Sequence, residues 1–124
     1  MTYTFTIQGD PVPKGRPRVY RGHANTPPRT VAAEKHVAFV LRAAGLRPLP
    51  GPVHLLVRFF RGTARRCDID NLVKLVMDAL NGIAWTDDDQ VVLLTASKLI
   101  DREKPRTEIS ISAVPAPIIW DEAA

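Results

Sequence analysis

The sequence predicts a single α+β domain in which a mixed β-sheet packs with two helices. Three observations support this fold class. Two segments repeat their apolar residues at helical spacing, four shorter segments alternate or run apolar as strands do, and a long proline-rich stretch separates the first strand from the first helix. The expected order is β-α-β-α-β-β. With 124 residues, 45% of them hydrophobic, the chain can bury one core.

The first expected element is a half-exposed strand over residues 2–8, where Tyr3, Phe5 and Ile7 alternate with threonines. A basic, proline-rich loop over residues 10–29 follows. Its five prolines exclude a regular helix or a central strand. Ordered loops longer than about 12–15 residues are uncommon inside compact domains and are usually functional, so we expect a function for this one.

Two helices are expected farther along the chain. Helical spacing of apolar residues begins at Thr30, the expected N-cap, and stops at Gly45. Residues 52–60 read as a second strand, and residues 61–66 as a polar, basic connector. The second helix is expected over residues 70–80, because one apolar stripe contains Leu72, Leu75, Val76, Ala79 and Leu80.

The last two expected strands are residues 91–100 and 107–114, and we expect them to pair as a hairpin across the polar bend at residues 101–106. The domain should then span residues 1–114, with residues 115–124 as a tail. No apolar run approaches the roughly 18 residues of a membrane span, and the first ten residues do not resemble a signal peptide. We therefore expect a cytoplasmic protein without membrane contact.

Charge is distributed unevenly along the chain, although the net charge is only +4. Residues 10–30 carry five cations against Asp10, and residues 58–66 carry four arginines and no acid. Residues 67–89 carry six aspartates against Lys74. An acidic centre flanked by basic segments suggests that metal cations lie between the carboxylates and the phosphates of a polyanion.

Several aspartates in this acidic centre are candidate metal ligands. Asp68 and Asp70 stand two apart before the second helix and would point to one side in extended geometry, while Lys74 lies one turn beyond Asp70. One of residues 87–89 could complete a three-carboxylate site. Hard oxygen ligands suit Mg²⁺ or Mn²⁺ and phosphoryl transfer, and the single cysteine and scattered histidines match no zinc spacing.

Structural alternatives exist for each of these features. Asp70 or Asn71 could cap the helix, and Lys74 could form an exposed ladder of ion pairs with Asp70 and Asp78. Residues 87–89 could form an ordinary acidic turn. A calcium EF-hand is excluded, because with Asp68 as loop position 1 the fifth and sixth positions hold Leu72 and Val73 in place of an oxygen ligand and a glycine.

The run DIDNLVKLVMDAL followed by WTDDDQV resembles the RusA family of Holliday junction resolvases, whose hallmark is DxDNxxKxxxDxL and then DD before a strand. The segments PVPKGRPRVYRG and TPPRT are also similar to elements of that family, and the resemblance covers most of residues 5–112. It implies a RusA-like fold and a Mg²⁺-dependent endodeoxyribonuclease, with Mn²⁺ as a substitute and no small-molecule cofactor. The expected enzyme is a homodimer that makes paired nicks in four-way DNA junctions.

The resemblance also assigns roles to individual residues. It implies catalytic roles for Asp68, Asp70, Lys74 and Asp88, with the three aspartates as metal ligands. Supporting roles fall to Asn71, Asp78 and Asp87, while Asp87 and Asp89 remain alternatives to Asp88 as ligand. The expected contacts to DNA phosphates, which fix position without reading bases, are Lys14, Arg16, Arg18, Arg61, Arg65 and Arg66.

Two other functions remain open from the sequence. One is a DNA-binding module without catalysis, in which the acidic patch recruits a protein partner. The other is a less specific nuclease for branched DNA. Aromatic residues make up only 6% of the chain, too few for a base-stacking platform, which favours recognition of duplex shape over single strands.

Overall fold

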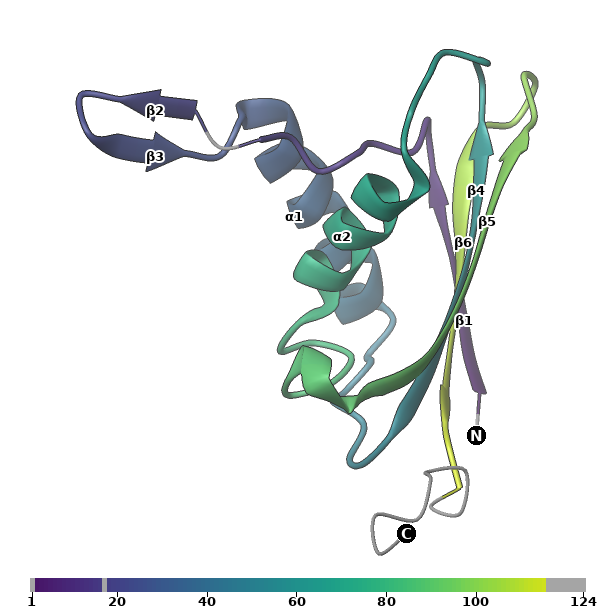
Figure 1. The fold of residues 1–124 in the computed structure, drawn as a ribbon. Helices are drawn as coiled ribbons and strands as arrows, with labels where there is room; N and C mark the ends of the chain where they lie inside the picture. Colours follow the sequence, from purple (N-terminus) through teal and green to yellow (C-terminus); the bar gives the residue numbers. More distant parts are fainter. Residues whose placement is uncertain (1, 17, 116–124) are drawn as a thin grey trace, which may run out of the picture.

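The fold is a four-stranded mixed sheet with two helices on one face, as shown by a computed structural model that describes residues 2–16 and 18–115 (Figure 1). The sheet contains β1 (Thr2–Gln8), β4 (Val53–Arg61), β5 (Val91–Ile100) and β6 (Arg106–Ala113). The helices are α1 (Pro28–Ala43) and α2 (Ile69–Leu80), and a short 3₁₀ turn, η1 (Asp88–Gln90), precedes β5. The predicted fold class is confirmed. The tail predicted for residues 115–124 lies, beyond residue 115, outside the described residues.

The strand order is β1-β6-β4-β5, so the hairpin predicted between β5 and β6 is wrong. Strand β4 lies between them, antiparallel to β6 and parallel to β5. The parallel pair arises because α2 connects β4 to β5 as a crossover helix, which returns the chain to the end of the sheet where β4 began. Alternate side chains of β4 are buried. A strand buried in this way is more stable when a neighbouring strand is hydrogen-bonded to each of its edges.

The basic loop contains a structure that was not predicted, a separate hairpin of β2 (Arg18–Tyr20) and β3 (His23–Asn25). No proline falls within residues 18–25. The proline argument therefore excluded a strand of the main sheet but not two strands of three residues each. Such short strands carry too little alternation to be recognised from sequence.

The ends of α1 differ in how well they were predicted. Thr30 is not the N-cap, because the helix begins at Pro28, a residue suited to the first turn since proline lacks the N–H. The stop at Gly45 is confirmed. Its φ of 80° permits two closing hydrogen bonds, from the amide of Gly45 to Arg42 O and from the amide of Leu46 to Leu41 O.

The core lies between the helices and the sheet. The stripe predicted on α2 is buried as expected and packs with Leu55, Val57 and Phe59 of β4. Trp85, in the turn after α2, is also fully buried. Neither helix within the described residues is long and apolar enough to cross a membrane.

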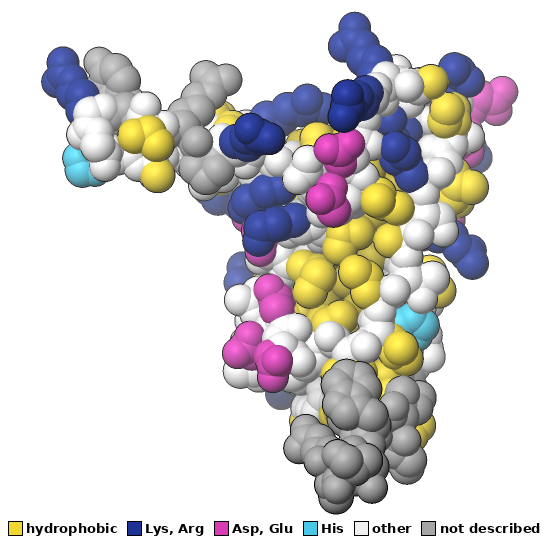
Figure 2. All heavy atoms as spheres, in the orientation of Figure 1, with side chains coloured by type: hydrophobic (Ala, Val, Ile, Leu, Met, Phe, Trp, Pro, Cys, Tyr) yellow, Lys and Arg dark blue, Asp and Glu magenta, His cyan; other side chains and the backbone are white. Residues whose placement is uncertain are grey.

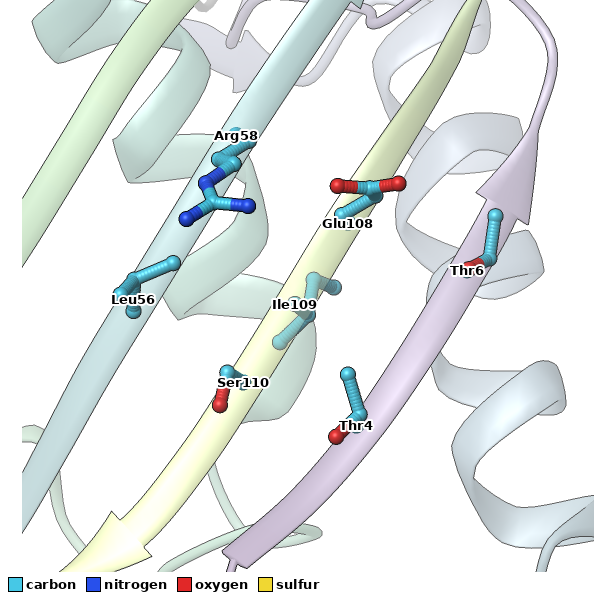
Figure 3. A pocket seen from close by; sticks show the side chains of 7 residues that line it. All are labelled: Thr4, Thr6, Leu56, Arg58, Glu108, Ile109 and Ser110. Atoms are coloured by element: carbon cyan, nitrogen blue, oxygen red, sulfur yellow. The ribbon is translucent and has the colours of Figure 1, made fainter.

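The opposite face of the sheet is not covered by α1 or α2 (Figures 1 and 3). It carries a shallow hollow of about 300 Å³, whose lining includes Thr4 and Thr6 of β1, Arg58 of β4, and Glu108 and Ser110 of β6. The pairing of Arg58 with Glu108 in the β4–β6 register places opposite charges on neighbouring strands. The aspartates expected to bind metal lie on other elements, Asp68 and Asp70 at the start of α2 and Asp88 in η1.

A core substitution in α2 tests this packing. Leu80→Ala should lower the free energy of unfolding by about 2–5 kcal/mol, because it removes a fully buried side chain and leaves a cavity. Phe39→Ala, at a site on α1 that is 69% exposed, should change it by less than about 0.5 kcal/mol. Urea unfolding of both variants at one protein concentration gives the comparison, and equal losses would contradict the assignment of the core.

Candidate functional site

A groove of about 400 Å³ runs between α2 and β5 on the helical side of the sheet. Its apolar lining includes Val73 and Met77 from α2 and Leu94 and Ala96 from β5. Four charged residues share this groove, and they are Asp70, Lys74, Asp78 and Asp88. Figure 2 shows the apolar strip, with acidic side chains beside it and lysines and arginines crowding its upper end. The structure therefore gathers three of the four residues predicted to be catalytic around one groove.

Helix α2 supplies Asp70, Lys74 and Asp78 at successive i, i+4 positions next to its buried stripe. Asp70 lies in the first turn, where the helix dipole favours a carboxylate, and its Oδ1 accepts the amide of Asn71 at 2.9 Å. The Lys74 side chain is 64% exposed, and its Nζ lies 3.5 Å from Asp78. Of the exposed ion pairs that were the structural alternative for Lys74, the pair with Asp78 is therefore present, as a long contact.

Asp88 is the member of the acidic turn that lines the groove. Its Oδ1 accepts a hydrogen bond of 2.7 Å from Nε1 of the buried Trp85, so the core fixes the position of this carboxylate. Asp87 instead caps the 3₁₀ turn by accepting the amide of Asp89 at 3.2 Å. Gln90 holds the same turn by donating to Leu49 O at 2.7 Å. Asp87 therefore belongs to an ordinary acidic turn, which was the structural alternative for residues 87–89.

Asp68 lies beside the groove, not in it. Its backbone is extended (φ −77°, ψ 132°), but α2 begins at the next residue, so the extended geometry expected through Asp70 is wrong. Asp68 lines a neighbouring cavity of about 230 Å³ with Arg65, Arg66 and Lys98. It occupies the N-cap position of α2 without making a side-chain cap.

Aspartate carboxylates are the type of ligand that a hard divalent cation prefers. Among residues 2–16 and 18–115, no three His, Cys, Asp or Glu side chains gather closely enough to hold a metal. Mg²⁺ is usually held by one or two carboxylates together with waters and substrate phosphates, so an all-protein cage is not required. Asp70 and Asp88 both line the groove, but α2 separates their carboxylates along it, because Asp70 lies in the first turn of the helix and Asp88 in the turn beyond its other end.

Lys14, predicted to contact DNA, lies between the two helices. Its Nζ pairs with Glu34 of α1 and with Asp78 of α2 at 3.1 Å, and its amide donates to Asn71 O at 2.9 Å. Partial burial disfavours the charged form, but the hydrogen bonds to Glu34 and Asp78 outweigh it, so the pKa of Lys14 is raised. Lys14 and Asp78 thus fasten the basic loop to both helices.

The other predicted DNA contacts are placed differently from one another. Arg16, Arg65 and Arg66 are exposed, whereas the Arg18 side chain lies outside the described part of the structure. Arg61 is buried, and its Nη1 donates to Arg65 O at 2.6 Å, which holds the connector. A second cavity of about 230 Å³ is lined by Arg61, Arg65 and Arg66 together with Arg29, so the two basic segments meet there.

One residue of this region was missed from the sequence. Lys98 lies in the cavity beside Asp68, and its Nζ donates to Cys67 O at 2.6 Å. The only signal in the sequence was a single lysine within the mainly apolar segment of residues 91–100. Its position depends on the parallel pairing of β5 with β4, which sequence reasoning did not find.

Comparison with known proteins gives a consistent result. The sequence profile of the family described as Endodeoxyribonuclease RusA matches residues 8–112. The chain is 36% identical to the uncharacterized protein YqaN of Bacillus subtilis (strain 168), over 90% of this chain and 96% of that protein. It is 31% identical to the crossover junction endodeoxyribonuclease RusA of Escherichia coli (strain K12), over 90% of this chain and 94% of that protein.

The fastening role of Lys14 leads to a stability prediction. Lys14→Met should lower the free energy of unfolding by about 1–2 kcal/mol at neutral pH, because it leaves Glu34 and Asp78 close together without their cation. Since folding raises the pKa of Lys14, its contribution is complete below the ordinary value of 10.5 and is lost as pH rises through the raised value. Chemical unfolding at pH 7 and at alkaline pH measures this, with Lys14→Arg as the charge-preserving control. A deficit that persists undiminished above the raised pKa would contradict it.

Proposed function

The chain belongs to the RusA family of endodeoxyribonucleases, and from this we propose that it cuts four-way DNA junctions by paired nicks with the help of Mg²⁺ or Mn²⁺. The observation that supports the proposal most is the groove between α2 and β5, whose lining includes Asp70, Lys74 and Asp88. Asp70 and Lys74 lie on α2, and Asp88 lies in the short turn before β5. The cytoplasm is the proposed place of action.

In the proposed mechanism, Asp68, Asp70 and Asp88 would supply the carboxylate ligands of the metal, and its binding would have to draw them closer together than they lie among the described residues. Bound there, the metal would polarise the scissile phosphate and lower the pKa of a water. Lys74 projects from the rim of the groove, where its exposed ammonium can neutralise the charge that develops on the phosphate. Trp85 keeps Asp88 in place through its 2.7 Å hydrogen bond, so this ligand is oriented before substrate arrives.

The DNA backbone is proposed to follow the basic cavities next to the groove. Arg65 and Arg66 are exposed there, and Arg29 and Lys98 lie beside them. Arg16 and Arg18, on the basic loop, are proposed to extend this contact. Lys14 and Arg61 are proposed to hold the basic segments in place and not to contact DNA themselves, because their charged groups already bind Asp78 and Arg65 O. Phosphate contacts of this kind fix the register of the DNA without reading its sequence.

A homodimer is proposed as the active form, and β5 is the proposed interface. This strand lies at the edge of the sheet, and five of its apolar residues are between 37% and 49% exposed, namely Val92, Leu93, Leu94, Leu99 and Ile100. A long, apolar edge strand tends to pair with another chain. A symmetric dimer would present two copies of the groove to a substrate with its own near two-fold symmetry.

The ligand assignment makes a prediction with a matched control. Asp88→Asn should reduce the cleavage rate of a four-way junction by about 100-fold or more, because it removes a metal ligand while the amide oxygen can still accept from Trp85. Asp89→Asn removes the same charge from the neighbouring exposed residue and should leave the rate within about 3-fold. Asp70→Asn should resemble Asp88→Asn.

These variants also separate the proposed function from its alternatives. Cleavage is followed on labelled four-way junction and on linear duplex, with Mg²⁺ and without it. Junction binding without nicking by the unaltered protein would favour a binding module, and equal nicking of both DNAs would favour a general nuclease. Equal rates for Asp88→Asn and Asp89→Asn would refute the choice of Asp88.

The dimer interface is tested separately. Leu93→Lys places a charge on the exposed edge strand and should convert a dimer into a monomer, whereas Phe39→Lys on α1 should not. Sedimentation velocity over a range of protein concentrations measures this. A dimer that tolerates Leu93→Lys, or an unaltered protein that remains monomeric throughout that range, would remove β5 from the account.

A further inference from the structure

The β2–β3 hairpin stands away from the rest of the molecule, next to the N-terminal end of α1 (Figure 1). All three residues of β3 are exposed, and Val19 of β2 is 73% exposed. None of these residues therefore packs into the core. A lone two-stranded hairpin is marginally stable in water, so a hairpin of this kind gains stability by binding a partner.

The base of the hairpin is held firmly although the hairpin itself projects. On the incoming side, the amide of Gly15 donates to Thr30 Oγ1 at 2.9 Å, and the amide of Lys14 donates to Asn71 O. The outgoing side runs directly into α1, whose N-cap is Pro27. The two sides approach so closely that a Cβ on Gly15 would lie 2.9 Å from Pro27 Cγ. The base therefore anchors the hairpin to α1 and to α2, the helix that lines the groove.

The tip of the hairpin carries Arg21 at a turn position whose backbone conformation does not favour arginine. Tyr20 pairs with His23, so the turn consists of Arg21 and Gly22 alone, with φ values of 50° and 80°. A two-residue turn with both φ values positive is of type I′, for which Asn-Gly is a preferred sequence. Arginine is strained in this left-handed conformation, and strain of this kind concentrates at functional positions.

The charge of the segment indicates which partner the hairpin fits. Residues 11–33 contain five cations and no acidic residue, and two of the cations, Arg18 and Arg21, belong to the hairpin and its turn. A two-stranded ribbon has the dimensions to enter the major groove of duplex DNA, and an arginine can pair there with phosphates or base edges. The uniform positive charge favours a nucleic acid over a protein partner.

We propose that the β2–β3 hairpin is a DNA-binding arm, which places Arg21 in a groove of the duplex that flanks the cleavage site. The inference rests on the proposed function in that the duplex is taken to be an arm of the four-way junction. It adds a DNA contact outside the α2–β5 groove. This contact is made by Arg21, a residue type that a type I′ turn does not favour. Arg21 thereby contributes to affinity, and cleavage chemistry remains with the groove.

The test measures DNA binding without cleavage. Fluorescence anisotropy with a labelled four-way junction in EDTA compares the unaltered protein with Arg21→Asn, Arg21→Lys and Arg47→Asn. Arg21→Asn suits the turn better than arginine but lacks the charge, so it should weaken binding about 3- to 10-fold at 150 mM salt and reduce the salt slope by about one. Arg21→Lys should retain most of the affinity. Arg47→Asn removes an exposed charge beyond the opposite end of α1 and should match the unaltered protein.

Hydroxyl-radical footprinting provides a second readout, in which Arg21→Asn should lose protection on a junction arm away from the cleavage site. Unchanged affinity and footprint in Arg21→Asn would overturn the proposal, as would equal weakening by Arg47→Asn. A shift to monomer in Arg21→Asn on sedimentation would instead assign the hairpin to a second copy of the chain. If the unaltered protein binds the junction but never nicks it with Mg²⁺, the proposed function fails while the binding comparison still decides the arm.

Discussion

The parallel pairing of β5 with β4 through α2 is the constraint on which the rest of this structure depends. The apolar stripe of α2 must cover β4, so the neighbouring surface of the helix, with Asp70, Lys74 and Asp78, faces the edge strand β5. The return of the chain to the start of β5 then brings Asp88 to the same groove. The same crossover places Lys98 next to the connector that follows β4. The charged groove is therefore a direct consequence of how the core is buried.

Two further interactions tie this site to the body of the protein. The hydrogen bond from Trp85 links the position of Asp88 to the most deeply buried aromatic side chain. Lys14 joins Glu34 to Asp78 and thereby holds the basic loop across both helices. Charged groups held in this way lose little further conformational freedom when a substrate binds, which is the advantage of an organised site. Substitutions in the core or in the basic loop should therefore alter the positions of the charged groups in the groove, even when the substituted residue does not line it.

The parts of this fold that follow from local pattern could be predicted, and those that depend on distant pairing could not. The stripe of α2 and the stop at Gly45 are local signals, and both are confirmed. The β5–β6 hairpin was wrong because adjacency in the sequence was taken for adjacency in the sheet, whereas β4 separates the two strands. The acidic turn showed that a carboxylate was available, but only the bond from Trp85 and the groove distinguish Asp88 from Asp87 and Asp89. Lys14 looked like a phosphate contact because its charge is visible in the sequence while its partners, 20 and 64 residues away, are not.

We propose that the groove between α2 and β5 binds a divalent cation with Asp70 and Asp88 among its ligands. Paramagnetic broadening of backbone NMR signals during titration with Mn²⁺ tests it most directly, because the effect falls steeply with distance from the ion. The account predicts that the amides of Asp70, Lys74 and Asp88 broaden at the lowest Mn²⁺ concentrations, while that of Ser110, on the opposite face of the sheet, remains sharp. Uniform broadening over both faces, or broadening that starts at the outer face, would contradict it.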